Sequence, residues 1–341
     1  CISLRKKRGK TMNYIGSKYS LMPFLTETIA AVAGTDTHMS FADLFAGTGV
    51  VGKTFKEKGY SVIANDIQYY SYILNKHLIE NVPPLDVQEL LDDLNDLPGA
   101  DGFVYRNYCA GSGSGRNYFT DENGRKCDAV RLELERLKDC GALDDARYTY
   151  LLASLIHSID KYANTASVYG AFLKGVKKSA AKTFRLELLP VVDGSRTGRA
   201  YNEDIHSLIR TVSGDILYLD PPYNARQYCT NYHVLETIAR YDAPQLKGKT
   251  GLRDYAAQKS DFCSARTVAG AFEDVIRNAE FRYIFLSYNN EGLMPFDVIR
   301  SIMQKYGSYE IFLTDYKRFK DENRRHKSSR TTEYLHCLLK R

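Results

Sequence analysis

The stretch that decides the fold is FADLFAGTGVVG, residues 41–52. Its apolar beginning predicts a short buried strand, and VVGKTFKEKG (50–59) predicts a helix that ends at Gly59. SVIAND (61–66) predicts a second strand, so the segment forms a strand–helix–strand unit. Residues 47–52, GTGVVG, match the glycine pattern of dinucleotide-binding folds, but the same turn also holds S-adenosylmethionine. The pattern alone leaves hydride chemistry and methyl chemistry open.

The rest of the 341-residue chain continues this alternation around a helical interruption. Helices are predicted at 20–34, 68–81, 127–140, 144–163 and 203–210, and further strands at 215–220, 282–288, 309–316 and 333–340. The last two strands flank a basic loop and predict a hairpin. The Pro83-Pro84 pair, Pro98-Gly99 and the glycine-rich run AGSGSG (110–115) indicate a domain boundary. We therefore predict an α/β domain from residues 12–82 and 196–341, a mainly helical insertion at 83–195, and a tail at 1–11.

Composition narrows the class of protein. The apolar fraction is 44% and the charged fraction 26%, and no apolar run approaches the ~18 residues of a membrane helix. Seven cysteines stand singly without zinc spacing, which predicts reduced thiols, a cytoplasmic location and no metal site. The net charge of +6 is concentrated at 174–185 and 316–330. Such clusters suit a polyanion, although solvated faces are an equal alternative.

A second motif, LDPPYN (219–224), follows a predicted buried strand. Asp220 then lies at the carboxyl end of the strand, where open α/β sheets bind ligands. Pro221 and Pro222 fix the backbone, so that the Asp220 carboxylate and the Pro221 carbonyl can accept hydrogen bonds from an exocyclic amine. Tyr223 offers a ring on which a base flipped out of a duplex can stack. A rigid turn without function is the alternative.

The chain resembles the Dam-type, alpha-group adenine-N6 DNA methyltransferases. The resemblance rests on NYIGSK (13–18), FADLFAGTG (41–49), AND (64–66), NEDI (202–205) and DPPYN (220–224), in that family's order. It implies a Rossmann-like sheet of seven strands with one antiparallel strand, S-adenosylmethionine as methyl donor, and the insertion as target-recognition domain. GKTGLRDY (248–255) suggests a restriction-modification subgroup.

The resemblance also implies a set of cofactor contacts: Tyr14, Lys18, Asp43, Phe45, Gly47, Gly49, Asp66, Ile67, Asp204, Ile205 and Asp220. Asp43 would repel a pyrophosphate but suits the sulfonium and ammonium of S-adenosylmethionine. Lys18 is a candidate for the cofactor carboxylate, unless it is simply an exposed lysine. Asp66 suits a ribose diol of either cofactor, and Asp204 is equally an ordinary helix cap.

Double-stranded DNA is the predicted partner, nucleoid association is predicted with it, and a cognate restriction endonuclease would act separately. The expected DNA contacts are Lys174, Lys177, Lys178, Arg226, Arg324, Arg325 and Arg330. The loop of Arg226, Gln227 and Tyr228 either closes on the extruded base or caps the next helix. Three other functions stay open: methylation of RNA adenine or cytosine N4, a nicotinamide-dependent oxidoreductase, and a DNA-binding regulator without activity. The sequence does not indicate which DNA site is recognised.

Overall fold

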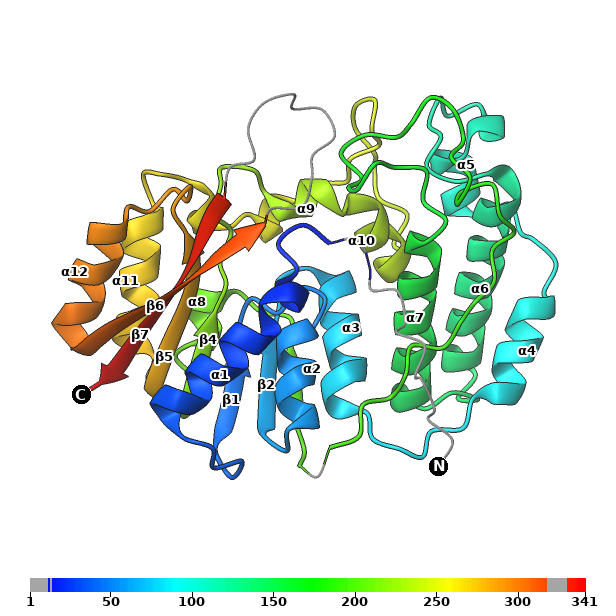
Figure 1. Cartoon of the computed structure of the whole chain (residues 1–341). Helices are drawn as coiled ribbons and strands as arrows, with labels where there is room; N and C mark the ends of the chain where they lie inside the picture. The colour runs from blue at the N-terminus through cyan, green and yellow to red at the C-terminus, as the bar shows by residue number, and fades with distance from the viewer. Residues whose placement is uncertain (1–11, 13, 195, 318–329) are drawn as a thin grey trace.

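The computed structural model describes residues 12, 14–194, 196–317 and 330–341. At its centre is a sheet with the strand order β3-β2-β1-β4-β5-β7-β6 (Figure 1). Strand β7 pairs antiparallel with β5 and β6, and all other pairings are parallel. The predicted sheet of seven strands with one antiparallel strand is confirmed. The strands are β1 (Ser40–Asp43), β2 (Ser61–Asn65), β3 (Arg199–Tyr201), β4 (Ser213–Leu219), β5 (Glu280–Asn289), β6 (Gly307–Lys317) and β7 (Arg330–Lys340).

Helices cover both faces of the sheet, because successive side chains of a strand enter different cores. Phe41 and Ile216 enter the core beneath one group of helices, and their neighbours Ala42 and Leu217 enter the core beneath the other. The first group is α1 (Met22–Ala33), α2 (Val50–Glu57) and the end of α3 (Tyr69–Glu80). The second is α8 (Ile205–Leu208), α11 (Val268–Asn278) and α12 (Phe296–Tyr306). Burial on both faces explains why the middle of β1, Phe41 and Ala42, and residues 216–219 of β4 are apolar without alternation.

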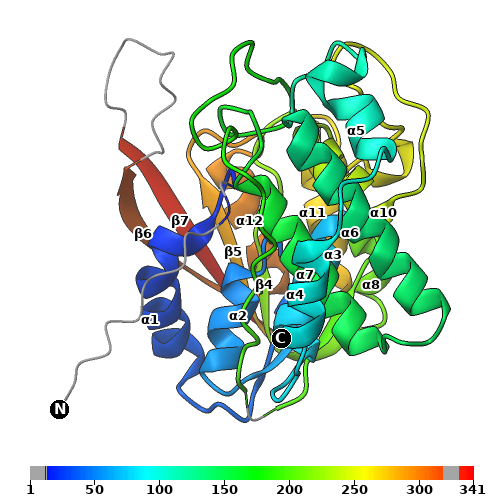
Figure 2. The same ribbon diagram turned by 90° about the vertical axis from the view of Figure 1, so that its right-hand side faces the viewer.

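A helical layer stands beside the sheet and has its own apolar core (Figure 2). It comprises α4 (Gln88–Asp96), α5 (Phe103–Tyr108), α6 (Asp121–Asp139), α7 (Asp145–Asp160) and α10 (His233–Arg240). The core also takes Ile73 and Leu74 of α3 and Val234 of α10, which lie outside the predicted insertion of 83–195. The insertion is therefore packed directly onto the sheet domain through α3 and α10.

Two charged side chains of α6 fix the helices around it. The Asp128 carboxylate accepts the backbone N–H groups of Val104 and Tyr105 at the start of α5, at 2.9 and 2.7 Å. Arg131 donates to the carbonyls of Ile238 and Ala239 at the end of α10, at 2.9 and 3.0 Å. Both contacts satisfy backbone groups that a helix end leaves without intrahelical partners. Helix α10 begins soon after the DPPYN motif, so these contacts help to fix the chain that leaves it.

Most predicted elements are present, and the hairpin of β6 and β7 is confirmed. Strand β3 and helices α4, α5, α9 (Tyr228–Asn231), α10, α11 and α12 were not predicted. Strand β3 and helices α5 and α9 are three to six residues long, so local pattern does not single them out. Helices α4, α10, α11 and α12 do place apolar residues at helical spacing, and this signal was overlooked. The predicted tail at 1–11 and most of the basic loop lie outside the described residues.

Candidate active site

A cavity opens at the carboxyl ends of β1, β2 and β4, where the glycine turn and the DPPYN segment meet. Gly47 and Gly49 have φ values of +53° and +78°, which favour glycine. A Cβ atom on Gly49 would lie 2.8 Å from Asn75 Oδ1, and one on Gly47 would lie 3.0 Å from the ring of Tyr14. The turn therefore needs glycine both for its conformation and for its close approach to α3 and the N-terminal segment.

Asp66 directly follows β2 and stabilises the glycine turn. Its carboxylate accepts the backbone N–H groups of Gly47 at 2.9 Å and Gln68 at 2.8 Å. Burial raises the pKa of Asp66 to about 6, although these N–H groups act in the opposite direction. The side chain lines the cavity as predicted, with its position set by two backbone donors.

Asp43 ends β1 at the base of the cavity and is only 1% exposed. Its Oδ1 atom is buried and has no hydrogen-bond partner among the described residues. Burial, reinforced by the nearby carboxylates of Asp220 and Asp66, raises the pKa of Asp43 well above its usual range. A buried carboxylate without a cation is costly, so this atom is suited to a positively charged ligand.

Asp220 follows β4 and belongs to a compact buried cluster of charges. Its Oδ1 accepts the hydroxyl of Tyr223 at 2.5 Å and forms an ion pair with Lys18 Nζ at 3.1 Å. The same ammonium lies 2.8 Å from Oε1 of Glu333, which is 3% exposed, and also donates to the Tyr223 hydroxyl. Ser287 donates to Glu333 Oε1 at 2.7 Å. Lys18 thus forms ion pairs with two buried carboxylates, those of Asp220 and Glu333.

This cluster leaves one side of Asp220 available. Every hydrogen bond and ion pair that Asp220 makes with the described residues falls on Oδ1, so Oδ2 can accept a ligand hydrogen. Burial raises the pKa of Asp220 to about 6, with Lys18 and Tyr223 opposing the shift and Glu333 adding to it. Although burial disfavours its charge, the two carboxylates raise the pKa of Lys18 above its usual value. The sequence assigned Lys18 to a cofactor carboxylate, but its partners here are both protein carboxylates.

Glu333 was not predicted. The pattern of β7 holds a signal for Glu333, because residues 333, 335 and 337 share one face and Leu335 and Cys337 are core residues. A glutamate at such a position needs a partner, which Lys18 supplies across 315 residues of chain.

Aromatic side chains form much of the remaining wall. Tyr14 stacks on Tyr232 with ring centroids 4.7 Å apart, and Phe45 meets Phe262 edge to face at 5.2 Å. Phe45, Ile67 and Ile205 line the cavity, as the resemblance implied. The segment 258–262, which includes Phe262, also lines it and was not predicted.

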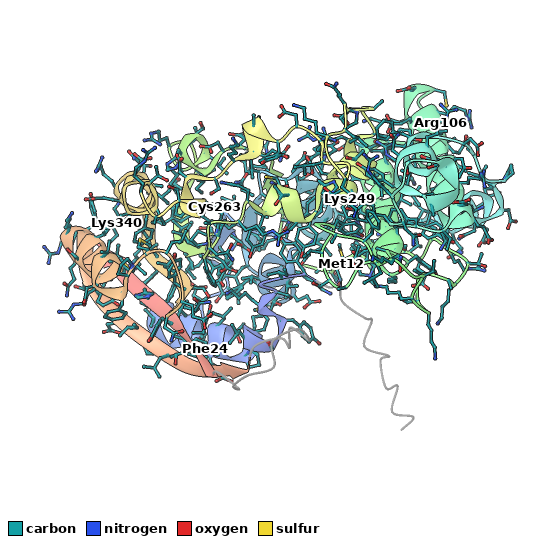
Figure 3. All side chains as sticks on the ribbon, turned by 90° about the horizontal axis from the view of Figure 1, so that it is seen from above. Met12, Phe24, Arg106, Lys249, Cys263 and Lys340 are labelled. Carbon is teal, nitrogen blue, oxygen red and sulfur yellow. The ribbon has the colours of Figure 1, made fainter. Side chains whose placement is uncertain are left out.

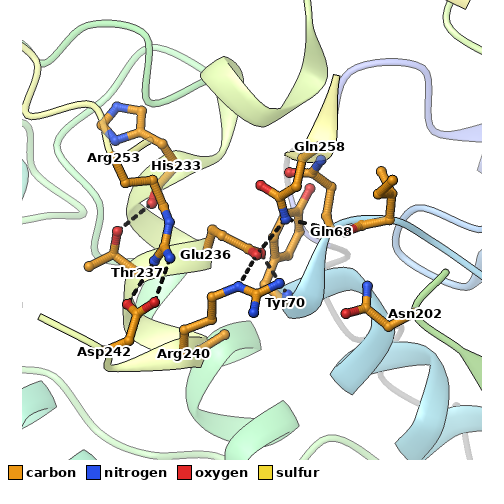
Figure 4. Close-up of polar contacts among 12 residues, drawn as sticks. Gln68, Tyr70, Asn202, His233, Glu236, Thr237, Arg240, Asp242, Arg253 and Gln258 are labelled. Atoms are coloured by element: carbon orange, nitrogen blue, oxygen red, sulfur yellow. Dashed lines mark hydrogen bonds and ion pairs between the residues drawn. The ribbon is translucent and has the colours of Figure 1, made fainter. Parts of the chain in front are cut away.

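Two glutamines hold the unpredicted segment over the cavity. Gln227 pairs with the backbone of Ser260 in both directions, at 3.1 and 2.8 Å. Gln258 donates to Glu236 Oε1 at 2.7 Å and to the carbonyl of Ile67 at 3.2 Å. Figure 4 shows Glu236 receiving Gln258 and Arg240 together. The segment is therefore tied both to the loop after DPPYN and to the end of β2.

Asp204 caps a helix at the edge of the cavity, and its contact with a cofactor stays a prediction. It lines the cavity, and its carboxylate caps α8 by accepting the N–H of His206 at 2.9 Å. Among the described residues no group of three or more histidine, cysteine, aspartate or glutamate side chains has an arrangement that could hold a metal ion. No described helix is both long enough and apolar enough to cross a bilayer.

The predicted DNA-contact residues differ in exposure, and some of them lie outside the described part of the chain. Lys174, Lys178 and Arg226 are exposed. Lys177 is half-buried and donates to the carbonyl of Thr165 at 2.7 Å, so it also supports its own loop. Arg324 and Arg325 lie outside the described residues, and Arg330 is placed only as the first backbone position of β7.

Comparisons with known proteins identify the family. Residues 14–302 match the model of the D12 class N6 adenine-specific DNA methyltransferases. The chain is 52% identical to Type II methyltransferase M.NlaIII of Neisseria lactamica over 96% of this chain and 99% of that protein. It is 40% identical to Type II methyltransferase M.FokI of Planomicrobium okeanokoites, covering 96% of this chain and 53% of that one. It is 37% identical to M.CviAII of Paramecium bursaria Chlorella virus 1, covering 91% and 93%. The chain belongs to the D12 class N6 adenine-specific DNA methyltransferase family.

Proposed function

We propose that this protein transfers a methyl group from S-adenosylmethionine to N6 of an adenine flipped out of double-stranded DNA, with Asp220 orienting the amine. The observation that carries the proposal is the position of Asp220. Its carboxylate enters the cavity that contains the glycine turn, with Oδ1 held by Lys18 and Tyr223 and Oδ2 available.

The adenine amine is a weak nucleophile because its lone pair is delocalised into the ring. Asp220 Oδ2 and the Pro221 carbonyl, neither of which accepts a hydrogen bond from a described residue, can receive its two hydrogens. This pairing turns the lone pair toward the methyl group. When the methyl arrives, the nitrogen becomes cationic and its proton is readily lost, so Asp220 need not be a strong base. The ring of Tyr223 is proposed to stack on the base, and Pro222 keeps the turn rigid.

The residues present fit S-adenosylmethionine, which supplies an electrophilic methyl group on a sulfonium. We assign its ammonium to the unpaired Oδ1 of Asp43, and its ribose hydroxyls to Asp66. Phe45, Phe262 and Ile205 offer apolar surface for its adenine ring. Lys18 is assigned to Asp220 rather than to the cofactor, because Asp220 and Glu333 already hold its ammonium.

The relatives are named as Type II methyltransferases and modification methylases. We therefore infer that this protein protects one DNA sequence within a restriction-modification system. A cognate endonuclease would act as a separate protein, and the enzyme would work in the cytoplasm at the nucleoid.

The test is transfer of a labelled methyl group to mixed-sequence duplex DNA, followed by nucleoside analysis. We expect N6-methyladenine in DNA, whereas N4-methylcytosine or methylated RNA would contradict the proposal. Asp220→Ala should reduce the rate by at least about a thousandfold, since it removes an acceptor that acts at the reacting nitrogen. Asp297→Ala, which changes an exposed aspartate on α12, is the control and should keep the full rate. Calorimetry should show that Asp220→Ala still binds S-adenosylmethionine, and normal turnover by Asp220→Ala would refute its role.

A further inference from the structure

A tight hairpin at residues 247–252 lies between α10 and the turn at Ala256–Gln258. It falls outside the predicted insertion of 83–195. Lys247 and Leu252 pair through both backbone hydrogen bonds, at 2.8 and 2.9 Å, and Gly251 donates to the Gly248 carbonyl at 3.2 Å. Both glycines have a φ of +67°. The shape of the turn therefore favours glycine at positions 248 and 251, but none of the hairpin's residues lines the cofactor cavity.

Side chains of the helical layer hold three carbonyls of this hairpin. Arg116 donates to the carbonyls of Gly248 and Lys249, at 3.1 and 3.2 Å. The buried hydroxyl of Tyr108 donates to the carbonyl of Gly251 at 3.1 Å. The Tyr118 hydroxyl lies 3.2 Å from the intervening carbonyl of residue 250, but its shorter hydrogen bond, of 2.7 Å, is to the carbonyl of Tyr169. An exposed turn with three carbonyls fixed to the protein has a defined orientation.

That orientation directs hydrogen-bond donors outward. In a trans peptide the N–H group lies opposite the preceding carbonyl, so inward carbonyls at 248 and 249 place the N–H groups of Lys249 and Thr250 on the outer side. Neither of these N–H groups has a partner among the described residues. Lys247 and Lys249 are exposed, and neither forms an ion pair with a described acid. The hairpin therefore combines amide donors with unpaired cations, a combination that binds anions.

The hairpin is joined to a second basic loop on the same side of the molecule. Asn117, next to Arg116, donates to the carbonyls of Leu173 and Lys174, at 3.2 and 3.3 Å. Lys174 and Lys178 in that loop are exposed. Figures 1 and 2 show these loops on the upper side, where the parallel strands end, and Figure 3 looks onto this side with Lys249 near its middle. The surface thus lies on the side to which the cofactor cavity opens.

We propose that the 247–252 hairpin binds a backbone phosphate of duplex DNA next to the target adenine. The amides of Lys249 and Thr250 hold the phosphate oxygens, and the ammonium groups of Lys247 and Lys249 neutralise it. A phosphate contact positions the duplex without reading its sequence. This inference rests on the proposed DNA methylation, and it extends the DNA-binding surface beyond the predicted insertion.

The test is binding of the full chain to a duplex oligonucleotide over a range of KCl concentrations. Loss of a phosphate contact lowers the slope of log K against log salt by about 0.9, so Lys249→Ala should flatten the slope by about 1. The double variant Lys247→Ala/Lys249→Ala should bind about tenfold more weakly at 0.1 M salt and flatten the slope further. Lys58→Ala is the control, because Lys58 is exposed just after α2, at the opposite end of the sheet.

A second variant separates orientation from charge. Arg116→Lys keeps the charge but cannot hold two carbonyls as the guanidinium fork does. It should weaken DNA binding several-fold with the salt slope unchanged. All variants should bind S-adenosylmethionine normally, which shows that they are folded.

The outcomes distinguish the inference from the proposed function. A wild-type protein that neither binds nor methylates duplex DNA would overturn the proposed function. A wild-type protein that methylates DNA, together with unchanged affinity and slope in the double variant, would overturn the inference alone. Weaker binding to single-stranded RNA without weaker binding to the duplex would also overturn it.

Discussion

Asp43 and Asp220 end neighbouring parallel strands and line one cavity, yet their surroundings differ. Asp220 has Lys18 within 3.1 Å and a hydroxyl on the same oxygen. Asp43 has a buried oxygen that finds no hydrogen-bond partner in the described part of the chain, and it lies near other acids. Burial raises the pKa of both carboxyls, but of the two only Asp220 has a cation among the described residues that opposes the shift. We call the part of the cavity around Asp43 the cofactor half and the part around Asp220 the catalytic half. The cofactor half therefore lacks a cation among the described residues, whereas the catalytic half contains Lys18.

This difference indicates which kind of ligand each half of the cavity can bind. A carboxylate that is already held in place by a lysine can orient a neutral group such as an amine without moving toward it. A carboxylate without a cation gains most from a ligand that brings one, because that ligand relieves the cost of burial as it binds. We infer that the protein's own lysine defines the geometry of catalysis, and that the cofactor's charge completes the other half.

After Asp220→Ala, the largest expected effect comes from Asp43→Asn, which keeps the shape of the side chain but removes its charge. Loss of one partner of a buried charge pair costs about 2 kcal/mol or more, so S-adenosylmethionine should bind about 30-fold more weakly. Calorimetry measures this directly. 5′-Methylthioadenosine is the control ligand, because it lacks both the sulfonium and the amino acid. It should bind the variant and the wild type equally, and equal losses for both ligands would contradict the assignment to a cationic group.

Stability gives an independent check on Asp43. A carboxyl whose folded pKa is raised costs stability above its unfolded pKa of about 3.9, and the cost grows until the pH passes the folded value. Without cofactor, Asp43→Asn should therefore unfold at a higher temperature than the wild type at pH 7, and the difference should shrink toward pH 4. Thermal unfolding at a series of pH values measures it. A wild type that is the more stable protein at pH 7 would mean that Asp43 has a cation partner.

A smaller effect is expected from Glu333→Gln, which removes the second acid around Lys18. Its negative charge adds to the raised pKa of Asp220, which is about 6. Removing it should lower that pKa, so Asp220 stays ionised to lower pH and the acidic limb of single-turnover methylation moves to lower pH. Lys18 would then pair with Asp220 alone and hold it more tightly, which should slow transfer by about tenfold.

A glutamate on the adjacent edge strand, β6, provides the control for this shift of the acidic limb. Glu310→Gln changes an exposed glutamate on β6 and should leave the pH profile unchanged. A purely structural role for Glu333 predicts a lower rate with the acidic limb in place. An acidic limb that moves to higher pH would contradict the electrostatic account.

The sequence predicts the three aspartates of the site better than it predicts Glu333, for a physical reason. Asp43 is the last residue of β1, and Asp66 and Asp220 directly follow β2 and β4, so local pattern alone places them at the same sheet edge. Glu333 reaches the site only because β7 pairs antiparallel with β5, which sets it opposite Asn289 and beside Ser287. Which strands pair, and in which register, depends on packing across the whole sheet rather than on neighbours in sequence.

The fold shows the same division between local and long-range information. The strand–helix–strand unit and the terminal hairpin were predicted because periodicity specifies them. The sequence does not predict that α3 and α10 contribute to the core of the helical layer. Both faces of α3 are apolar, and the pattern does not indicate which face packs on the sheet and which packs on the helical layer. Segment 258–262 was missed for a simpler reason, since its short 3₁₀ turns have no period.

The smallest predicted effect concerns the link between the two halves. Gln227 belongs to the loop after DPPYN, and its amide pairs twice with Ser260 in the segment that closes the cofactor side. Each of two such hydrogen bonds contributes about 0.5–1 kcal/mol net, and water replaces part of this in a half-buried site. Gln227→Ala should therefore raise the KM for S-adenosylmethionine about threefold and slow single-turnover transfer by a similar factor, because one contact orders both loops.

Two other glutamines serve as controls. Gln258→Ala loosens the same segment from the cofactor side and should raise the KM without slowing transfer. Gln245→Ala changes an exposed glutamine and should alter neither the KM nor the rate of transfer. If Gln227→Ala changes KM alone, as Gln258→Ala does, the glutamine secures only the cofactor, and the halves are joined solely through the sheet.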